Sequence, residues 1–327
     1  MGLVAAEFLK LRRSRVGVFA VLLPLLATVA GAVNYWVNRD ALNGGWDSLA
    51  SQVTLFYGLM FFNLGVALMA ASVWRPEHRD ASWNIVLTSG HRSWAVVLAK
   101  SVVLVAPVAV AQVVLLVLTW ALGLTMGMPG WPGAAFALSC ALAVVIAVPL
   151  VLAQSLLSML MKSFAAPVAV CLLLSGIGFG SIAASTGVVG ALSYALPQGL
   201  ASRALFLGST AVTVTGGLSL QSVAPLLAGC AVLSVLLVCA TVLIAPRRTI
   251  EAQRYGLGSL KELLGVQNVH HRAFSDAVSC FEIFKFALKR LPWSVQSTED
   301  LILFSKTAKS LALPKPQILG HGKGEIL

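Results

Sequence analysis

The chain has 327 residues, of which 58% are hydrophobic and 11% charged, and its mean hydropathy is +0.89. This composition excludes a soluble protein built around a single apolar core. The charges are spread unevenly: residues 1–248 carry 13 Lys or Arg and 5 Asp or Glu, whereas the 79 residues that follow carry 10 and 7. The sequence therefore predicts a membrane domain over residues 1–248 and a water-compatible tail.

A helix needs about 20 apolar residues to cross the hydrocarbon layer of a bilayer, where its backbone must satisfy its own hydrogen bonds. Six runs of this kind are present, and the alternating pattern of a membrane barrel is not. The runs are Val16 to Val37, Val53 to Val73, Ser101 to Gly123, Ala134 to Met161, Phe164 to Ser185 and Val223 to Ala245. We therefore expect an all-α membrane protein with six transmembrane helices and a short helical tail, the fourth and fifth helices forming a tight hairpin.

Lys and Arg near the ends of membrane helices are retained on the cytoplasmic side. With the N-terminus inside, the segments between the six runs divide the basic residues very unequally. The inner segments hold Lys10, Arg12, Arg13, Arg15, Arg75, Arg79, Arg92, Lys100, Lys162, Arg247 and Arg248, and the outer segments hold Arg39 and Arg203. The pattern predicts a multi-pass protein with both termini in the cytoplasm.

The longest inner connection, residues 74–100, mixes charged with aromatic and apolar residues. Trp83, Val86 and Leu87 fall at helical spacing before a Ser-Gly pair interrupts the pattern. This predicts an amphipathic helix at the membrane face, positioned to meet a partner. A solvated loop with its arginines reaching toward the water is the alternative. The first fifteen residues likewise allow two interpretations, a short helix on the inner surface or a plain charged flank of the first span.

Three groups of residues carry a resemblance to a known family. They are the run Glu7-Phe8-Leu9-Lys10-Leu11-Arg12-Arg13, the ordered residues Glu77, Trp83, Leu87, Thr88, Arg92 and Lys100, and Tyr194 with Pro197 before the last run. With these features residues 1–248 resemble the permease subunits of type 2 ABC exporters, particularly the six-helix kind found with lantibiotic and bacitracin immunity systems. One departure is the stretch from Arg79 to Ser82, where that family commonly has a glycine.

The resemblance implies a subunit of the bacterial cytoplasmic membrane that forms half of a transmembrane path. It would pair with itself or a sister permease, while a separate ATPase binds ATP and Mg²⁺, so this chain would be no enzyme and hold no cofactor. The connection from Glu77 to Arg92 would dock in a groove of the ATPase, with Glu77, Trp83, Thr88 and Arg92 as coupling residues. The chain has no G-x-x-x-x-G-K-[ST] motif to bind the phosphates of ATP itself.

Polar and small residues inside the runs have structural interpretations. Asn63, Gln112 and Gln154 are uncharged amides expected to bond across helices, with a substrate role as the alternative. Gly176, Gly178 and Gly180 imitate part of a nucleotide fingerprint, but they lie inside an apolar run and indicate close helix packing. No Asp, Glu, Lys, Arg or His lies in the middle of a run, so the proton or ion relay of a coupled secondary transporter is not expected.

The tail carries a second resemblance. Tyr255 to Leu260, Leu264-Gly265-Val266, His271-Arg272-Ala273 and Asp276-Ala277 resemble the C-terminal end of DEDDh-type 3′–5′ proofreading exonucleases. The resemblance implies that His271 acts as the general base on a water molecule and that Asp276 binds one of two divalent metals. That family takes its other metal-binding carboxylates from an Asp-x-Glu strand and a middle Asp, and the membrane domain offers neither.

We therefore expect residues 249–293 to be an exonuclease-like helical fragment fused behind the permease, without a working metal site and without nucleic acid as a partner. Residues 294–327 are expected to be mostly irregular, because helical periodicity is lost and Pro and Gly become frequent there. A membrane-anchored exonuclease is the alternative function. A third possibility is a scaffold or immunity protein that binds a peptide in the membrane without transporting it.

Overall fold

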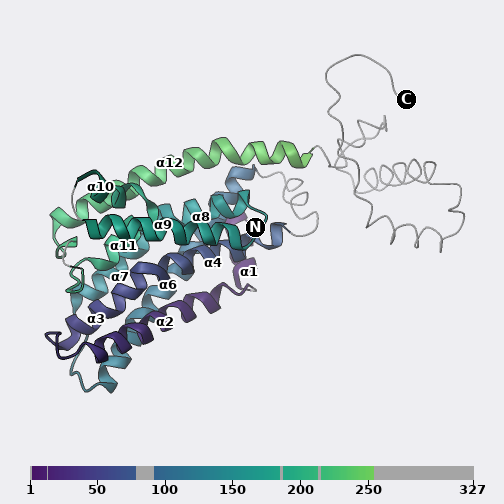
Figure 1. Cartoon of the computed structure of the whole chain (residues 1–327). Helices are drawn as coiled ribbons and strands as arrows, with labels where there is room; N and C mark the ends of the chain where they lie inside the picture. Colours follow the sequence, from purple (N-terminus) through teal and green to yellow (C-terminus); the bar gives the residue numbers. More distant parts are fainter. Residues whose placement is uncertain (1, 13, 79–91, 185–186, 213–214, 254–327) are drawn as a thin grey trace, which may run out of the picture. The chain divides into compact units, whose positions relative to one another are not determined.

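The computed structural model describes residues 2–12, 14–78, 92–184, 187–212 and 215–253, and within these ranges all regular secondary structure is helical (Figure 1). The helices are α1 (Leu3–Arg12), α2 (Val16–Val37), α3 (Gly45–Phe56), the π-helical turn η1 (Tyr57–Phe61), α4 (Phe62–Trp74), the 3-10 turn η2 (Pro76–His78), α6 (Ser93–Thr125), α7 (Ala134–Ile146), α8 (Val148–Leu160), α9 (Ala165–Ala184), α10 (Gly187–Ala195), α11 (Pro197–Phe206) and α12 (Leu220–Gln253).

Five helical segments of the described chain are long and apolar enough to cross a membrane. They are Val16–Val37, Gly45–Trp74, Ser93–Thr125, Ala165–Ala184 and Leu220–Pro246. A sixth span is formed by α7 and α8 together, which are bent by 42° at a short break. The all-α membrane fold expected from the sequence is confirmed, and six spans result when the bent pair is counted as one.

The second span contains the π-helical turn η1, where the regular hydrogen-bond ladder is disturbed. The carbonyl of Gly58 in this turn accepts a hydrogen bond of 2.6 Å from the Ser202 hydroxyl of α11. Gly58 also lets the Phe206 ring approach, since a Cβ there would lie 2.6 Å from the ring. The turn therefore fixes α11 against the second span.

The fourth span bends because Pro149 stands in the first turn of α8. Proline has no N–H to donate, and its ring clashes with the carbonyl four residues earlier, that of Val145. This carbonyl instead accepts a hydrogen bond of 3.5 Å from the Cys230 thiol of α12. The break at Ala147 thus has a local cause and a partner that compensates for it.

Helix α11 is wholly buried from Gln198 to Phe206, although the sequence predicted only an outer segment here. Arg203, counted as an outer charge, is 6% exposed and donates a hydrogen bond of 3.1 Å to the Tyr194 hydroxyl. A Cβ on Gly178 would lie 2.9 Å from the Cα of Gly199, so α9 and α11 are in close contact there. The predicted packing role therefore holds for one of the three glycines, since the other two face open space.

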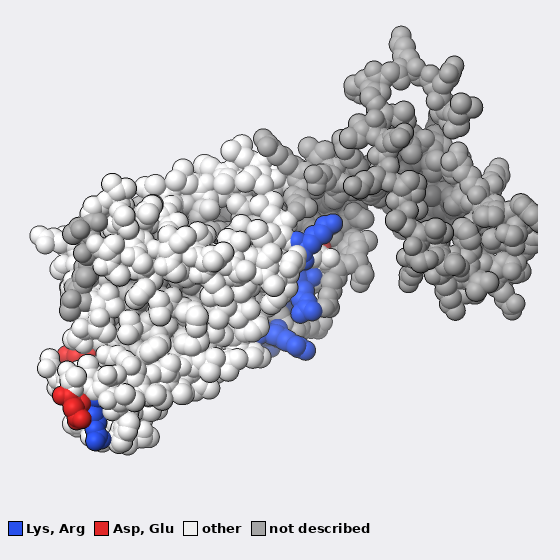
Figure 2. All heavy atoms as spheres, in the orientation of Figure 1, with Lys and Arg blue, Asp and Glu red and all other residues white. Residues whose placement is uncertain are grey.

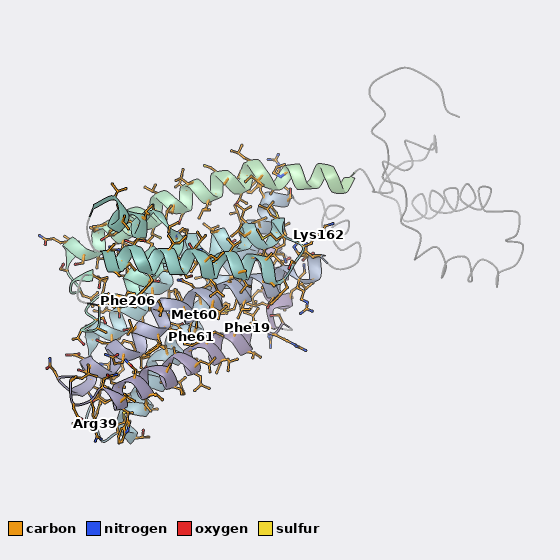
Figure 3. All side chains as sticks on the ribbon, in the orientation of Figure 1. Phe19, Arg39, Met60, Phe61, Lys162 and Phe206 are labelled. Carbon is orange, nitrogen blue, oxygen red and sulfur yellow. The ribbon has the colours of Figure 1, made fainter. Side chains whose placement is uncertain are left out.

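The surface is apolar between two ends that carry charge. Figure 2 shows Lys and Arg of the described residues gathered at the end of the bundle where α1 lies, which we call the α1 end. Figure 3 shows Lys162 at this end and Arg39 at the opposite end, with Phe19, Met60 and Phe61 between them. Such a belt is what a lipid-facing surface requires.

Candidate functional site

Four charged side chains meet at the α1 end, and we call them the ion cluster: Glu7 and Lys10 of α1, Glu77 of η2 and Lys100 of α6. The Lys100 ammonium nitrogen lies 2.6 Å from Glu7 Oε2 and 2.9 Å from Glu77 Oε1. The Lys10 ammonium nitrogen lies 2.8 Å from Glu7 Oε1 and 3.2 Å from Glu77 Oε1. Each carboxylate is therefore shared by both ammonium groups.

Three members of the ion cluster are withdrawn from solvent. Lys100 is 1% exposed, Glu7 4% and Glu77 5%, whereas the Lys10 side chain is 55% exposed. Burying a charge is expensive unless an opposite charge and hydrogen bonds compensate for it. Here two carboxylates face two ammonium groups, so the cluster as a whole is neutral.

Local sequence places the members. Glu7 and Lys10 are three residues apart on α1 and therefore share one helix face. Helix α6 begins at Ser93, eight residues before the predicted start of the third span, so that Lys100 lies two turns inside the helix. Trp74 is the last residue of α4, and the centre of its ring lies 5.3 Å from the Lys100 ammonium group. The cluster thus joins α1, α4, η2 and α6.

Pairing shifts the titration of the α1 residues. Burial alone would raise the pKa of the Glu7 carboxyl, but the charge of Lys100 and hydrogen bonds from both lysines outweigh it and hold the pKa below its ordinary value. Burial alone would lower the pKa of Lys10, but its hydrogen bond to Glu7 and the charge of Glu77 outweigh it and raise the pKa. Both groups are therefore held in their charged forms.

The structure describes two of the four predicted coupling residues. Glu77 lies in the ion cluster, and Arg92 is an exposed residue directly before α6. Trp83 and Thr88 lie outside the described residues. The N-terminal segment does form a helix, as one of the two interpretations expected, but Glu7 faces the protein and not the water. The 3-residue spacing of Glu7 and Lys10 signals one shared face, yet it does not reveal the partners on η2 and α6.

The amides inside the spans follow the prediction in two cases. Asn63 Nδ2 donates to the Ser202 hydroxyl of α11 at 3.3 Å, and Gln112 Nε2 donates to the Tyr57 hydroxyl at 3.4 Å. Gln154 is fully buried, and neither polar atom of its side chain has a partner among the described residues. Asn63 and Gln112 therefore bond across helices through their side-chain nitrogens, while their side-chain oxygens have no partner among the described residues.

Among the described residues, no group of three or more His, Cys, Asp or Glu side chains is placed to hold a metal ion. His271 and Asp276, the exonuclease-like residues of the tail, lie outside the described part of the chain.

Comparison with known proteins identifies the membrane domain. A family model described as "ABC-2 family transporter protein" matches residues 3–178, which is more than half of the chain. No curated protein and no solved structure matches. The matched region contains the first four predicted spans, most of the fifth and all members of the ion cluster. The chain therefore belongs to the ABC-2 transporter family and is a membrane-embedded permease component of an ABC transporter.

Proposed function

We propose that this chain is the permease subunit of an ATP-binding-cassette exporter that is driven by a separate ATPase. It forms half of the substrate path and pairs with a second copy or with a sister permease. ATP and Mg²⁺ bind to the ATPase and not to this chain. We place the α1 end in the cytoplasm of a bacterium, with both termini on that side. The gathering of Lys and Arg at this end supports the orientation (Figure 2).

The ion cluster carries the proposal. The connection between α4 and α6 is described as far as His78 of η2 and again from Arg92, directly before α6. Its first part is tied to α1 and α6 through the two contacts of Glu77. Force applied to this connection by a closing ATPase therefore reaches α1, α4 and α6 together, and these are linked to the first three spans.

This arrangement divides the coupling residues into two roles. Trp83, Thr88 and Arg92 touch the ATPase, whereas Glu77 is a positioning residue that acts through Lys100, because its carboxylate is buried. The exported substrate is of the lantibiotic or bacitracin class, that is, an amphiphilic peptide taken from the membrane. The sequence resemblance alone supports this substrate class.

The test uses the full chain, tagged and purified from its native membranes together with the ATPase that remains bound to it, and reconstituted in liposomes. We expect the permease to stimulate ATP hydrolysis by its partner several-fold. Trp83→Ala and Arg92→Ala should abolish most of this stimulation while the complex still co-purifies. Arg39→Gln at the opposite end is the matched control and should leave the stimulation unchanged.

Failure of the wild-type chain to retain or stimulate an ATPase would refute the proposal. The exonuclease alternative predicts a different activity of the same preparation. It requires metal-dependent trimming of DNA 3′ ends that disappears with Asp276→Ala. Labelling of single cysteines introduced at positions 12 and 39 of a cysteine-free chain tests the orientation, since only the second should react from outside intact cells.

A further inference from the structure

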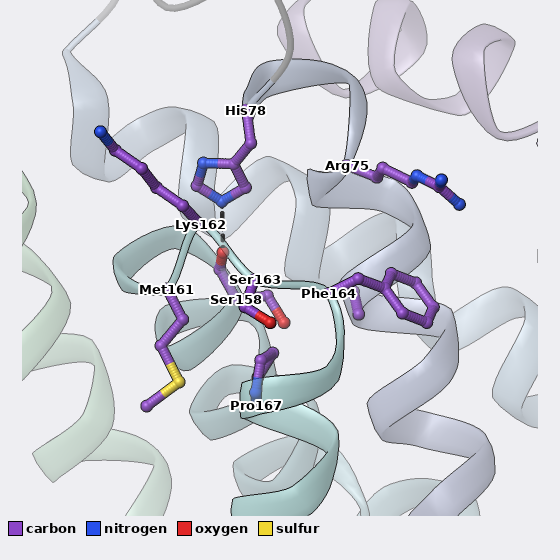
Figure 4. A pocket seen from close by; sticks show the side chains of 9 residues that line it. Arg75, His78, Ser158, Met161, Lys162, Ser163, Phe164 and Pro167 are labelled. Atoms are coloured by element: carbon purple, nitrogen blue, oxygen red, sulfur yellow. Dashed lines mark hydrogen bonds between the residues drawn. The ribbon is translucent and has the colours of Figure 1, made fainter. Parts of the chain in front are cut away.

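A pocket at the α1 end is lined by none of the four residues of the ion cluster. It has a volume of about 160 Å³ and lies between the end of α4, η2 and the turn that joins α8 to α9 (Figure 4). This is many times the space that one water molecule needs. We call it the α8–α9 pocket and define it by Arg75, His78, Ser158, Lys162, Ser163 and Phe164.

The charged groups around this pocket have one sign. Arg75 and Lys162 extend to opposite sides of His78 (Figure 4), and no Asp or Glu lines the pocket among the described residues. Within the same part of the chain, neither cation has a carboxylate in ion-pair distance. The Arg75 guanidinium instead lies 5.6 Å from the centre of the Phe164 ring. The ion cluster nearby is neutral, whereas this pocket keeps its positive charge.

The backbone around the pocket adds to this preference. Helix α9 begins at Ala165, and its first N–H groups and positive dipole end lie next to the lining residues Ser163 and Phe164. The Ala166 N–H donates a hydrogen bond of 3.4 Å to the Ser163 hydroxyl, which is long for such a bond. Pro167 has no N–H, so the start of α9 contributes chiefly its positive dipole end.

One buried hydroxyl in the pocket lacks a partner. Ser158 is 2% exposed, and its Oγ makes no hydrogen bond within the described part of the chain. Its carbonyl is occupied, because it accepts a hydrogen bond of 2.6 Å from His78 Nε2. Figure 4 shows Ser158 among the lining residues between His78 and Pro167. A buried hydroxyl without a partner is costly, and an anion's oxygen in the pocket would satisfy it.

We propose that the α8–α9 pocket binds the phosphate headgroup of an anionic phospholipid. The exposed apolar surface of α9 supports a lipid over a free anion. Leu173 is 71% exposed and Ile177 is 52% exposed on this helix, which begins directly after the lining residue Phe164. They lie about 2.5 and 3.6 helical turns beyond Phe164, on a different face of α9. An acyl chain that rounds the start of α9 can lie on that face while the phosphate sits in the pocket. Basic pockets between helices at the cytoplasmic end are suited to such headgroups.

The experiment measures thermal unfolding of the purified full chain in a neutral detergent with added phosphatidylglycerol, phosphatidylcholine or inorganic phosphate. A ligand that binds only the folded state raises the unfolding midpoint, by an amount that grows with the logarithm of its concentration relative to its Kd. We expect phosphatidylglycerol to stabilise the wild type and phosphatidylcholine to do so far less. Arg75→Gln/Lys162→Gln should weaken phosphatidylglycerol binding at least tenfold, and Lys162→Gln alone severalfold.

Arg39→Gln is the matched control, because Arg39 is an exposed cation at the other end and should not alter binding. Lys162 lies at the surface of the α1 end, so its single variant tests the proposal even if the double variant fails to fold (Figure 3). Equal binding of phosphatidylglycerol by wild type and Lys162→Gln would overturn the proposal. So would equal stabilisation by inorganic phosphate, which would assign the pocket to a free anion. Loss of ATPase association in the variants without any loss of lipid binding would assign it to a protein partner.

Discussion

Removing Lys100 should cost far more stability than removing Lys10, although both contact the same two carboxylates. Lys100 makes the shorter contact with each, 2.6 Å to Glu7 and 2.9 Å to Glu77, and is 1% exposed. Lys100→Met would leave two buried carboxylates with one half-exposed cation. Removing one partner of a buried ion pair costs about 3–5 kcal/mol.

Lys10→Met is the matched comparison. The Lys10 side chain is 55% exposed, so solvent screens its contacts of 2.8 and 3.2 Å, and exposed ion pairs contribute about 1 kcal/mol or less. After this change Lys100 still bridges both carboxylates. The two variants should therefore differ by at least about 2 kcal/mol in the free energy of unfolding.

Reversible unfolding in mixed micelles, followed by Trp fluorescence, measures both variants. The double change Lys100→Met/Glu77→Gln leaves one carboxylate for Lys10 and should recover part of the loss, which a double-mutant cycle expresses as a coupling energy. Equal costs for the two lysines, or no recovery in the double variant, would refute the conclusion that Lys100 is the main counter-charge of both buried carboxylates.

Two further predictions concern pH and packing. Glu7 has a lowered pKa, so its pairing stabilises the fold above the ordinary carboxyl value of about 4.3, and this stability is lost as the pH falls further; Glu7→Gln should remove that dependence from a series of unfolding midpoints. Lys10 has a raised pKa, so its share is complete below about pH 10.4 and is lost as the pH rises through the folded-state value. Gly178→Ala should lower the free energy of unfolding by about 1–3 kcal/mol, because its Cβ would meet the Gly199 backbone at 2.9 Å. Gly176→Ala is the control, since its Cβ would meet open space, and it should stay within about 0.5 kcal/mol of wild type. Equal effects of the two changes would contradict the close contact of α9 with α11.

The spans could be predicted because the hydrocarbon layer imposes a length and an apolar composition on each one. The first span illustrates this, since the expected and observed bounds are both Val16–Val37. The third span was predicted to start at Ser101 because Lys100 looked like a flanking charge. Helix α6 instead begins at Ser93, since partners elsewhere in the chain neutralise Lys100 inside the helix.

The ion cluster could not be predicted either, because its members come from distant parts of the sequence. Lys100 is 93 residues from Glu7 and 23 from Glu77, and no local periodicity connects such distances. Helix α11 was also missed, because Gln198, Ser202 and Arg203 give it the composition of an exposed segment. Ser202 and Arg203 find hydrogen-bond partners inside the protein in Gly58, Asn63 and Tyr194, and this is visible only in three dimensions. The side-chain oxygen of Gln198 is buried without a partner among the described residues.

Glu77 and His78 are neighbours on η2, but their side chains contact different helices. Glu77 faces α1 and α6, where its charge is paired with Lys10 and Lys100. Separating these elements would leave buried charges without partners, which is energetically costly. The matched cluster therefore favours movement of α1, η2 and α6 as one unit. His78 faces α8, beside cations that the described residues leave unmatched. A phosphate bound there would add to the existing His78–Ser158 hydrogen bond between η2 and α8. In the proposed coupling, the lipid would therefore strengthen the path by which motion at η2 reaches the fourth and fifth spans.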